Sequence, residues 1–360
     1  MSGARKFWGL CLLGVLSTCF IGISLPAQAT PDQPVTRVLA FDNTPIYFTG
    51  NDNQRDVLAP SNFPAGGSFS KITMHISLAC PTGGCDPWDR YGTIGVVIPS
   101  TDVQITDSQP PPTIIELARF MTPYGVGASW STDVTDLRPI LRGAITLSAH
   151  IDTWVGPGNA NGAGWKLTTW FTMKPGKPIR ESVAVIPVWS PREVRYGDPV
   201  VPTAVDAPAV ALAVPAGGSF ALRTLVTGHG QGNKDDCSEF CSSTQTIRVS
   251  GEAHQLDLWR KDCATSGAHG QLGNYWYSRA GWCPGDLVKP WVIELGQDIS
   301  KTITKFAYGV TPYVNTCRPG ATPPVPTTCT LGTAPEYDGG RHTAPIYRLS
   351  TVLIVYQQGL

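Results

Sequence analysis

The sequence carries little charge and lacks the motifs of the common hydrolase classes. Only 15% of its 360 residues are charged, and the formal net charge is zero. There is no Gly-x-Ser-x-Gly elbow and no His-Glu-x-x-His pair, and the six histidines include no pair at ligand spacing on one strand face. Conventional hydrolase chemistry and a metal site are therefore not expected. The balanced charge also argues against nucleic acid or an anionic membrane as a partner.

Long apolar runs are missing too, apart from one at the N-terminus. Arg5 and Lys6 precede an apolar run over residues 7–25, and Ala27-Gln-Ala29 follows it. This order is typical of a secretory signal peptide, which predicts cleavage after Ala29 and a secreted or periplasmic protein. Cys19 follows Leu-Ser-Thr, where a lipoprotein signal has Gly or Ala, so lipidation is the weaker interpretation. No later run approaches the roughly 18 residues that span a bilayer.

The cysteines predict disulfides. Residues 30–360 hold eight of the ten cysteines, with 25 basic and 27 acidic residues and hence a net charge of −2. An even count in an exported chain indicates four disulfides and no metal cluster, although eight cysteines allow 105 pairings. Two spacings would close very small rings, Cys80 with Cys85 and Cys237 with Cys241.

Composition and periodicity predict an all-β protein. Gly and Pro together number 70, and Lys71-Ile-Thr-Met-His-Ile-Ser-Leu78 alternates apolar and polar residues as a half-buried strand does. We predict two side-by-side antiparallel jelly-roll β-sandwich domains, 30–176 and 177–360, joined at Lys174-Pro-Gly-Lys-Pro178. The predicted strands cover 71–78, 92–98, 114–120, 144–154, 165–173, 183–188, 220–227, 246–250, 291–295, 302–310 and 346–356.

Three acids beside aromatic residues are the candidate chemical groups. Cys80-Pro-Thr-Gly-Gly-Cys-Asp-Pro-Trp-Asp-Arg-Tyr91 places Asp89 next to Trp88 and Arg90, and Cys237-Ser-Glu-Phe-Cys241 places Glu239 inside the second ring. Asp152 and Trp154 share the non-core face of their strand. Paired carboxylates can activate water and protonate a leaving group. Tryptophan, acid and arginine together favour a glycan ligand, whereas each acid taken alone is more often structural.

These motifs carry a family resemblance. Cys80–Tyr91, Arg119-Phe-Met-Thr-Pro-Tyr124 and Thr132-Asp-Val-Thr-Asp136 resemble the N-terminal domain of bacterial peptide-N-glycosidase F. The C-terminal domain of that family is similar to Cys237–Cys241, His254-Gln-Leu256 and Arg279-Ala-Gly-Trp-Cys-Pro-Gly285 in the same order.

The resemblance implies two eight-stranded jelly rolls with the active site between them. It implies hydrolysis of the amide that joins the innermost N-acetylglucosamine to asparagine in N-linked glycoproteins or glycopeptides, without metal or cofactor. A monomer is expected. The matching positions imply catalytic roles for Asp89, Glu239 and Asp152. They imply substrate contacts from Arg90, Trp88, Tyr124, Trp154, His229, Arg279 and Trp282. The pairs Cys80–Cys85, Cys237–Cys241 and Cys263–Cys283 follow the family pattern, which leaves Cys317–Cys329.

The chain also departs from the family pattern. Asp152 stands where the family has a glutamate, His229 where it has tryptophan, and Gln231 where it has histidine. The segment 100–112 is longer than the family loop. With one aromatic wall missing, the alternative function is a lectin-like glycan-binding protein on the same fold. A copper monooxygenase is excluded because the paired histidines and the methionine ligand are absent. We expect carboxylates near His229 to raise its pKa above roughly 6.5.

Overall fold

The computed structural model describes residues 34–99, 113–215, 217–230, 237–297, 299, 303–315 and 345–357. The proposed signal peptide, Gln231, segment 100–112, the pair Cys317–Cys329 and most of the tail after Leu295 lie outside these residues. Within the described residues no helix is long and apolar enough to cross a membrane.

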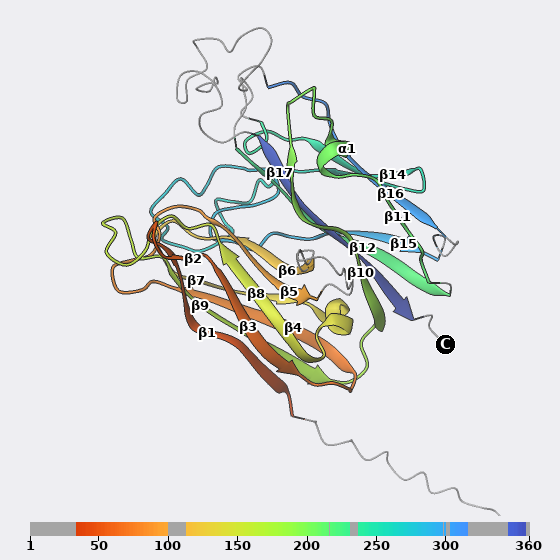
Figure 1. Cartoon of the computed structure of the whole chain (residues 1–360), viewed down its shortest axis with the longest axis horizontal. Coiled ribbons are helices and arrows are strands. Elements are labelled where there is room, and N and C mark those ends of the chain that lie inside the picture. The colour runs from red at the N-terminus through yellow and green to blue at the C-terminus, as the bar shows by residue number, and fades with distance from the viewer. Residues whose placement is uncertain are drawn as a thin grey trace, which may run out of the picture. The chain divides into compact units, whose positions relative to one another are not determined.

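The N-terminal half of the described chain forms two antiparallel sheets (Figure 1). One sheet has the order β2-β1-β9-β4-β7 and the other the order β3-β8-β5-β6. The 3-10 helix η1 (Thr135–Ile140) connects β7 with β8. The strands are β1 (Thr36–Phe48), β2 (Asn53–Gln54), β3 (Asp56–Phe63), β4 (Phe69–Ala79), β5 (Tyr91–Ile98), β6 (Thr113–Met121), β7 (Ala128–Asp133), β8 (Gly143–Ile151) and β9 (Trp165–Pro175).

The C-terminal half repeats this plan with two four-stranded sheets, β10-β17-β12-β15 and β11-β16-β13-β14. The short helix α1 (Thr203–Asp206) lies between β10 and β11. The strands are β10 (Ser182–Arg195), β11 (Val210–Leu212), β12 (Gly218–His229), β13 (Thr244–Val249), β14 (Glu252–Asp257), β15 (Trp291–Gly296), β16 (Thr304–Val310) and β17 (Ile346–Gln357). The predicted all-β fold with two sandwiches is confirmed. The domain boundary at 176/177 stays a prediction.

Strand β4 shows how alternation makes the core. Ile72, Met74, Ile76 and Leu78 are each at most 2% exposed and face the opposing sheet. Each apolar side chain removed from water contributes about 1.5–3 kcal/mol relative to exposure, so this face alone strongly favours the observed register.

Two of the strands that the sequence analysis missed, β1 and β3, lack a clean alternation of apolar and polar residues in the sequence. The pairing of β1 with β9 shifts register between Leu39 and Phe41 and again between Phe41 and Thr44, which interrupts the alternation of period two. Strand β3 buries Ala59 and Ser61 while Leu58 is 68% exposed. Because β3 is an edge strand, its Pro60 is tolerated there.

A buried charge network joins the halves at β6. Arg119 is fully buried and pairs with Glu116 at 2.7 Å. Its guanidinium also donates to the Thr227 hydroxyl at 3.0 Å and to the Arg348 carbonyl at 2.6 Å, both in the C-terminal half. The Ser350 hydroxyl donates to Glu116 at 2.5 Å. A buried ion pair is costly unless its remaining bonds are satisfied, and here the second half satisfies them. This network positions the ends of β6 and β12, from which the candidate site is built.

Candidate active site

The ring closed by Cys80–Cys85 leads into a loop that is fixed by one buried acid. Asp86 has no exposed surface, and its carboxylate accepts hydrogen bonds from the Trp88 amide at 2.9 Å, Arg90 Nε at 2.8 Å and the Thr153 hydroxyl at 2.7 Å. The loop therefore has one geometry between Asp86 and β5, which determines where Asp89 points.

Asp89 lies against Tyr124, which follows β6. The Tyr124 hydroxyl donates to Asp89 Oδ2 at 2.7 Å, and Arg279 Nη2 from the C-terminal half lies 3.7 Å from the same oxygen. Burial raises the pKa of Asp89, while the Tyr124 hydrogen bond and the Arg279 charge act in the opposite direction. The carboxylate is thus in a poorly hydrated place with two groups that favour its ionised form.

Glu239 reaches the same arginine from inside the second disulfide ring, Cys237–Cys241. Its Oε1 lies 3.4 Å from Arg279 Nε, and its backbone amide donates to the Gly230 carbonyl at 3.0 Å. Burial and the Asp89 charge raise the pKa of Glu239 from 4.5 to about 7. Two carboxylates that share one guanidinium compete for ionisation, and Glu239, with fewer compensating partners, retains the proton.

Arg279 is the centre of this arrangement. It is 3% exposed, its Nη1 donates to the Tyr277 carbonyl at 2.9 Å, and its guanidinium carbon lies 4.9 Å from the Trp282 ring centroid. The indole Nε1 of Trp282 donates to the Gly228 carbonyl at 2.8 Å. Planar contact with an aromatic ring and several hydrogen bonds to fixed acceptors hold the guanidinium in place, which a lysine ammonium could not match.

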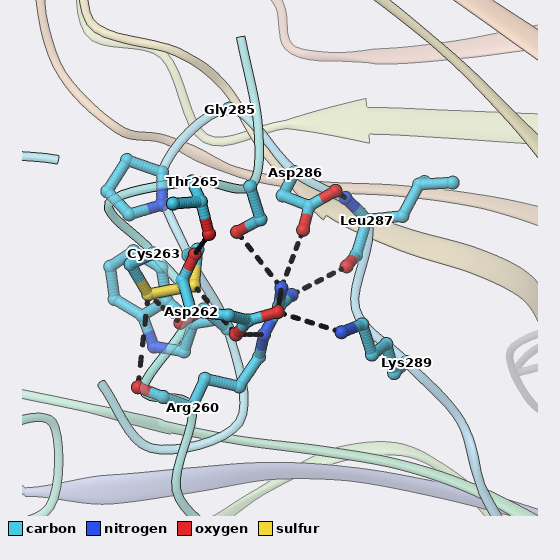
Figure 2. Close-up of polar contacts among 12 residues, drawn as sticks. Arg260, Asp262, Cys263, Thr265, Gly285, Asp286, Leu287 and Lys289 are labelled. Atoms are coloured by element: carbon cyan, nitrogen blue, oxygen red, sulfur yellow. Dashed lines mark hydrogen bonds and ion pairs between the residues drawn. A yellow bond between two sulfur atoms is a disulfide. The ribbon is translucent and has the colours of Figure 1, made fainter. Parts of the chain in front are cut away.

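The segment that carries Arg279 is anchored by a second ionic cluster (Figure 2). Arg260 pairs with Asp262 and with Asp286, each at 2.8 Å, beside the disulfide Cys263–Cys283. The backbones of Arg260 and Arg279 form an isolated β-bridge at the base of the intervening loop.

The structure contradicts the expectation for the pKa of His229. Burial, together with Arg348 and Arg119, lowers this pKa well below 6.5, so the imidazole is neutral in mildly acidic solution. The ring stacks on Trp282 with centroids 5.5 Å apart, and Nε2 is 2.8 Å from the Thr227 hydroxyl. The expectation was wrong because the charges facing His229 are guanidinium groups. The site's carboxylates contact Arg279, Tyr124, Arg55 and Arg348 instead.

Asp152 lies at a separate position, just after the end of β8. It pairs with Arg55 at 3.1 Å and approaches Arg348 at 4.0 Å. The Arg55 guanidinium also lies 4.5 Å from the Trp154 ring centroid. Arg55 therefore connects Asp152 to Trp154. Asp152 pairs with Arg55 and Arg348, whereas Asp89 and Glu239 both contact Arg279.

Stacked side chains connect the two acidic positions. Arg279 packs on Trp282, which stacks on His229, and the His229 ring meets the Tyr91 ring edge-on at 5.9 Å. Arg348 lies 3.9 Å from the Tyr91 centroid and completes the connection to Asp152. His229, where the resemblance led us to expect tryptophan, thus lies in a layer between the Asp89 and Glu239 pair and Asp152.

The remaining predicted residues divide into exposed and supporting ones. Trp88 and Trp154 are 58% and 52% exposed, so part of each ring is accessible to a ligand, although Arg55 lies over the Trp154 ring. Arg90 is committed to Asp86 and supports the loop. The sequence analysis gave no role to Arg55 and none of this detail for Asp86. The signal available for Asp86 was its place directly after Cys85, whereas Arg55 lies in a stretch without a motif.

A hollow of about 650 Å³ lies elsewhere, between β14 and β15, and contains none of the predicted catalytic residues. Its lining includes Trp259, Trp291 and Lys289. Across the part of the chain that the structure describes, no group of three or more His, Cys, Asp or Glu residues is arranged to hold a metal ion.

The fold has two β-sandwiches, and Arg279 is contacted by one acid from each half, Asp89 and Glu239. This combination can be compared with known classes of protein. The sequence profile described as peptide-N-glycosidase F, N terminal, matches residues 38–161, and the profile described as peptide-N-glycosidase F, C terminal, matches residues 206–328. The chain therefore belongs to the peptide-N-glycosidase F family, as the sequence motifs predicted.

Individual relatives agree with this assignment. The peptide-N(4)-(N-acetyl-beta-D-glucosaminyl)asparagine amidase F of Elizabethkingia miricola is 26% identical over 313 residues, which cover 81% of this chain and 82% of that protein. The structure of recombinant peptide:N-glycanase F matches with a TM-score of 0.70 at 24% identity, over 90% of this chain and 96% of that one. PNGF-II matches with a TM-score of 0.65 at 18% identity, over 90% and 66%. At these identities the structural matches establish the shared fold.

Proposed function

We propose that the protein is a peptide-N4-(N-acetyl-β-glucosaminyl)asparagine amidase. It hydrolyses the amide between the innermost N-acetylglucosamine and asparagine of N-linked glycoproteins or glycopeptides. The observation that carries this proposal is that Asp89 and Glu239, from the two halves, both contact the Arg279 guanidinium, Asp89 at Nη2 and Glu239 at Nε. The kinship with an amidase of the same family supports the choice of bond.

Asp89 is the base in this mechanism. An amide is a poor electrophile, so the attacking water must be deprotonated as it adds to the carbonyl carbon. Asp89 accepts that proton, and Tyr124 and Arg279 hold its carboxylate in place and favour its ionised form before the reaction. Arg279, which cannot lose its proton, is also a fixed positive charge beside the negative oxygen that develops in the tetrahedral intermediate.

Glu239 is the acid. With a pKa of about 7 it carries a proton in mildly acidic to neutral solution. It donates this proton to the amide nitrogen as the carbon–nitrogen bond breaks, because an unprotonated amide anion is a very poor leaving group. The products are an aspartate in the peptide and a glycosylamine. The net change is the addition of one water molecule, and solvent then returns Asp89 and Glu239 to their starting protonation states.

Asp152 contributes to sugar binding in this scheme. Its carboxylate contacts Arg55 and Arg348, and the half-exposed ring of Trp154 lies on the other side of Arg55. An aromatic face with carboxylate and guanidinium groups beside it suits a sugar ring with its hydroxyls. We also propose that the chain works outside the cytoplasm, which the three disulfides support.

The test is incubation of the purified protein with a defined high-mannose glycopeptide, followed by mass spectrometry of the peptide. The proposal predicts a glycan-free peptide with aspartate in place of the glycosylated asparagine. A peptide that keeps one N-acetylglucosamine would instead indicate cleavage between sugars. Retention of the glycopeptide without release would indicate the lectin-like alternative, which the exposed parts of the Trp88 and Trp154 rings would serve equally well.

A further inference from the structure

A turn of uncharged residues beside Arg279 remains without a role in this mechanism. Residues 272–277 read Leu-Gly-Asn-Tyr-Trp-Tyr, and here they are called the aromatic turn. Leu272 is 78% exposed, Trp276 48% and Tyr277 53%. Three large apolar side chains so close together on the surface differ from single exposed hydrophobic residues, which need no explanation.

The base of the aromatic turn is fixed to the catalytic groups. Arg279 donates to the Tyr277 carbonyl at 2.9 Å and to the Asn274 carbonyl at 3.3 Å. The same guanidinium lies 3.7 Å from Asp89, so Arg279 contacts both the backbone of the turn and the proposed base. The β-bridge between Arg260 and Arg279 closes the loop that carries the turn.

The other end of the turn rests on Tyr124. The Leu272 amide donates to the Tyr124 carbonyl at 3.1 Å, and the Gln271 side chain accepts from the Tyr124 amide at 3.2 Å. Gly273 lies so close to the Tyr124 ring that an added Cβ would meet it at 2.4 Å. The turn is therefore a rigid part of the site, and binding to it costs little ordering entropy.

The aromatic side chains are ordered with respect to each other. The rings of Tyr275 and Trp276 meet edge-on at 5.6 Å, and those of Trp276 and Tyr277 are tilted at 5.6 Å. No charged residue occurs between Leu272 and Tyr277. On the opposite half, by contrast, Trp154 lies against Arg55, which pairs with Asp152.

We propose that the aromatic turn binds the polypeptide part of the glycopeptide, and prefers apolar residues next to the glycosylated asparagine. This inference rests on the proposed function. Charged groups are strong partners for sugar hydroxyls, and the Trp154 side offers the Asp152 carboxylate and the Arg55 guanidinium, whereas the turn has no charged side chain. Uncharged aromatic and leucine side chains instead offer contact area to apolar side chains of a peptide. The two kinds of surface lie on different halves, as the two arms of a glycopeptide would require.

The first experiment compares two glycopeptides with the same glycan, one with leucine or phenylalanine and one with serine on each side of the asparagine. The wild type should cleave the apolar glycopeptide with a kcat/KM about tenfold higher than that for the serine glycopeptide, because its KM is lower. In the double variant Trp276→Ser, Tyr277→Ser this preference should be lost. The matched control is Leu58→Ser, a residue that is 68% exposed on β3, and its preference should equal that of the wild type.

The second experiment uses binding alone and separates this inference from the proposed amidase activity. The corresponding peptides without glycan are titrated against the wild type and the double variant by calorimetry. Tighter binding of the apolar peptide to the wild type only supports the inference even if no glycan is released. Equal binding to both proteins overturns it. An effect of the double variant that follows glycan size rather than peptide sequence also overturns it and would assign the turn to sugar binding.

Discussion

The raised pKa of Glu239 predicts that this catalytic acid destabilises the folded protein at alkaline pH. Glutamine at position 239 keeps the size of the side chain and can still accept a hydrogen bond from Arg279, but it does not titrate. A shift from 4.5 to about 7 corresponds to about 3 kcal/mol between the protonated and ionised forms in the folded state.

The direction of this pH effect on stability follows from proton binding at Glu239. Between pH 4.5 and 7 the folded protein binds a proton at Glu239 that the unfolded chain has released, so the stabilisation present below pH 4.5 is lost as the pH rises to about 7. Glu239→Gln lacks this loss. The free energy of unfolding of the variant minus that of the wild type should therefore be larger at pH 8 than at pH 5, by up to about 3 kcal/mol.

Urea unfolding at both pH values measures this difference. Glu252→Gln is the matched control, because the Glu252 side chain is 79% exposed. The same preparations report catalysis, where Glu239→Gln should lose about 10²–10⁴ in kcat. The wild-type kcat/KM should also decline as the pH rises above about 7, and the residual activity of the variant should lack this decline. A stability difference between wild type and Glu239→Gln that is the same at pH 5 and pH 8 would refute the reasoning.

Three further substitutions test separate contacts. Arg279→Lys should lower kcat/KM by at least about 10², because one ammonium cannot replace the separate Nη2 and Nε contacts with Asp89 and Glu239. Steady-state kinetics with an unaltered melting temperature measure this, and near-normal activity would contradict it. Asp86→Ala should lower the free energy of unfolding by about 3 kcal/mol, since three hydrogen bonds to a buried carboxylate are lost. Denaturant titration measures this change, and a loss below about 1 kcal/mol would mean that other contacts hold the loop. His229→Phe should leave the acidic limb of the kcat/KM profile in place, because the imidazole is already neutral there; a limb that moves would restore a titrating role for His229.

Much of the fold and several residues of the candidate site could be predicted from local sequence patterns. The alternation in β4 predicted a half-buried strand, and burial of Ile72 and Met74 confirms it. The three disulfides present in the described chain are those that the family resemblance implied. Asp89 and Glu239 were predicted as site residues because each lies in or next to a small cysteine ring, which is a strong local signal.

The remainder depends on contacts between distant parts of the chain. The hydrogen bonds of Arg119 to Thr227 and Arg348 join positions more than 100 residues apart, and no periodicity marks them. The pKa of His229 was mispredicted because it is determined by burial and by two guanidinium groups from other strands. Arg55 was missed because its partner Asp152 is 97 residues away. Ionic partners chosen by tertiary structure leave little trace in local sequence.

The most direct test of the account is a single-turnover reaction of a glycopeptide with excess protein in water labelled with heavy oxygen, for the wild type and Asp89→Asn. If Asp89 activates water, the wild type should release the glycan and leave one labelled oxygen in the new aspartate. Asp89→Asn should fold normally and release glycan at least about 100-fold more slowly. An unlabelled aspartate would mean that Asp89 attacks the carbonyl itself. A variant that keeps more than about a tenth of the wild-type rate would contradict the central role of Asp89.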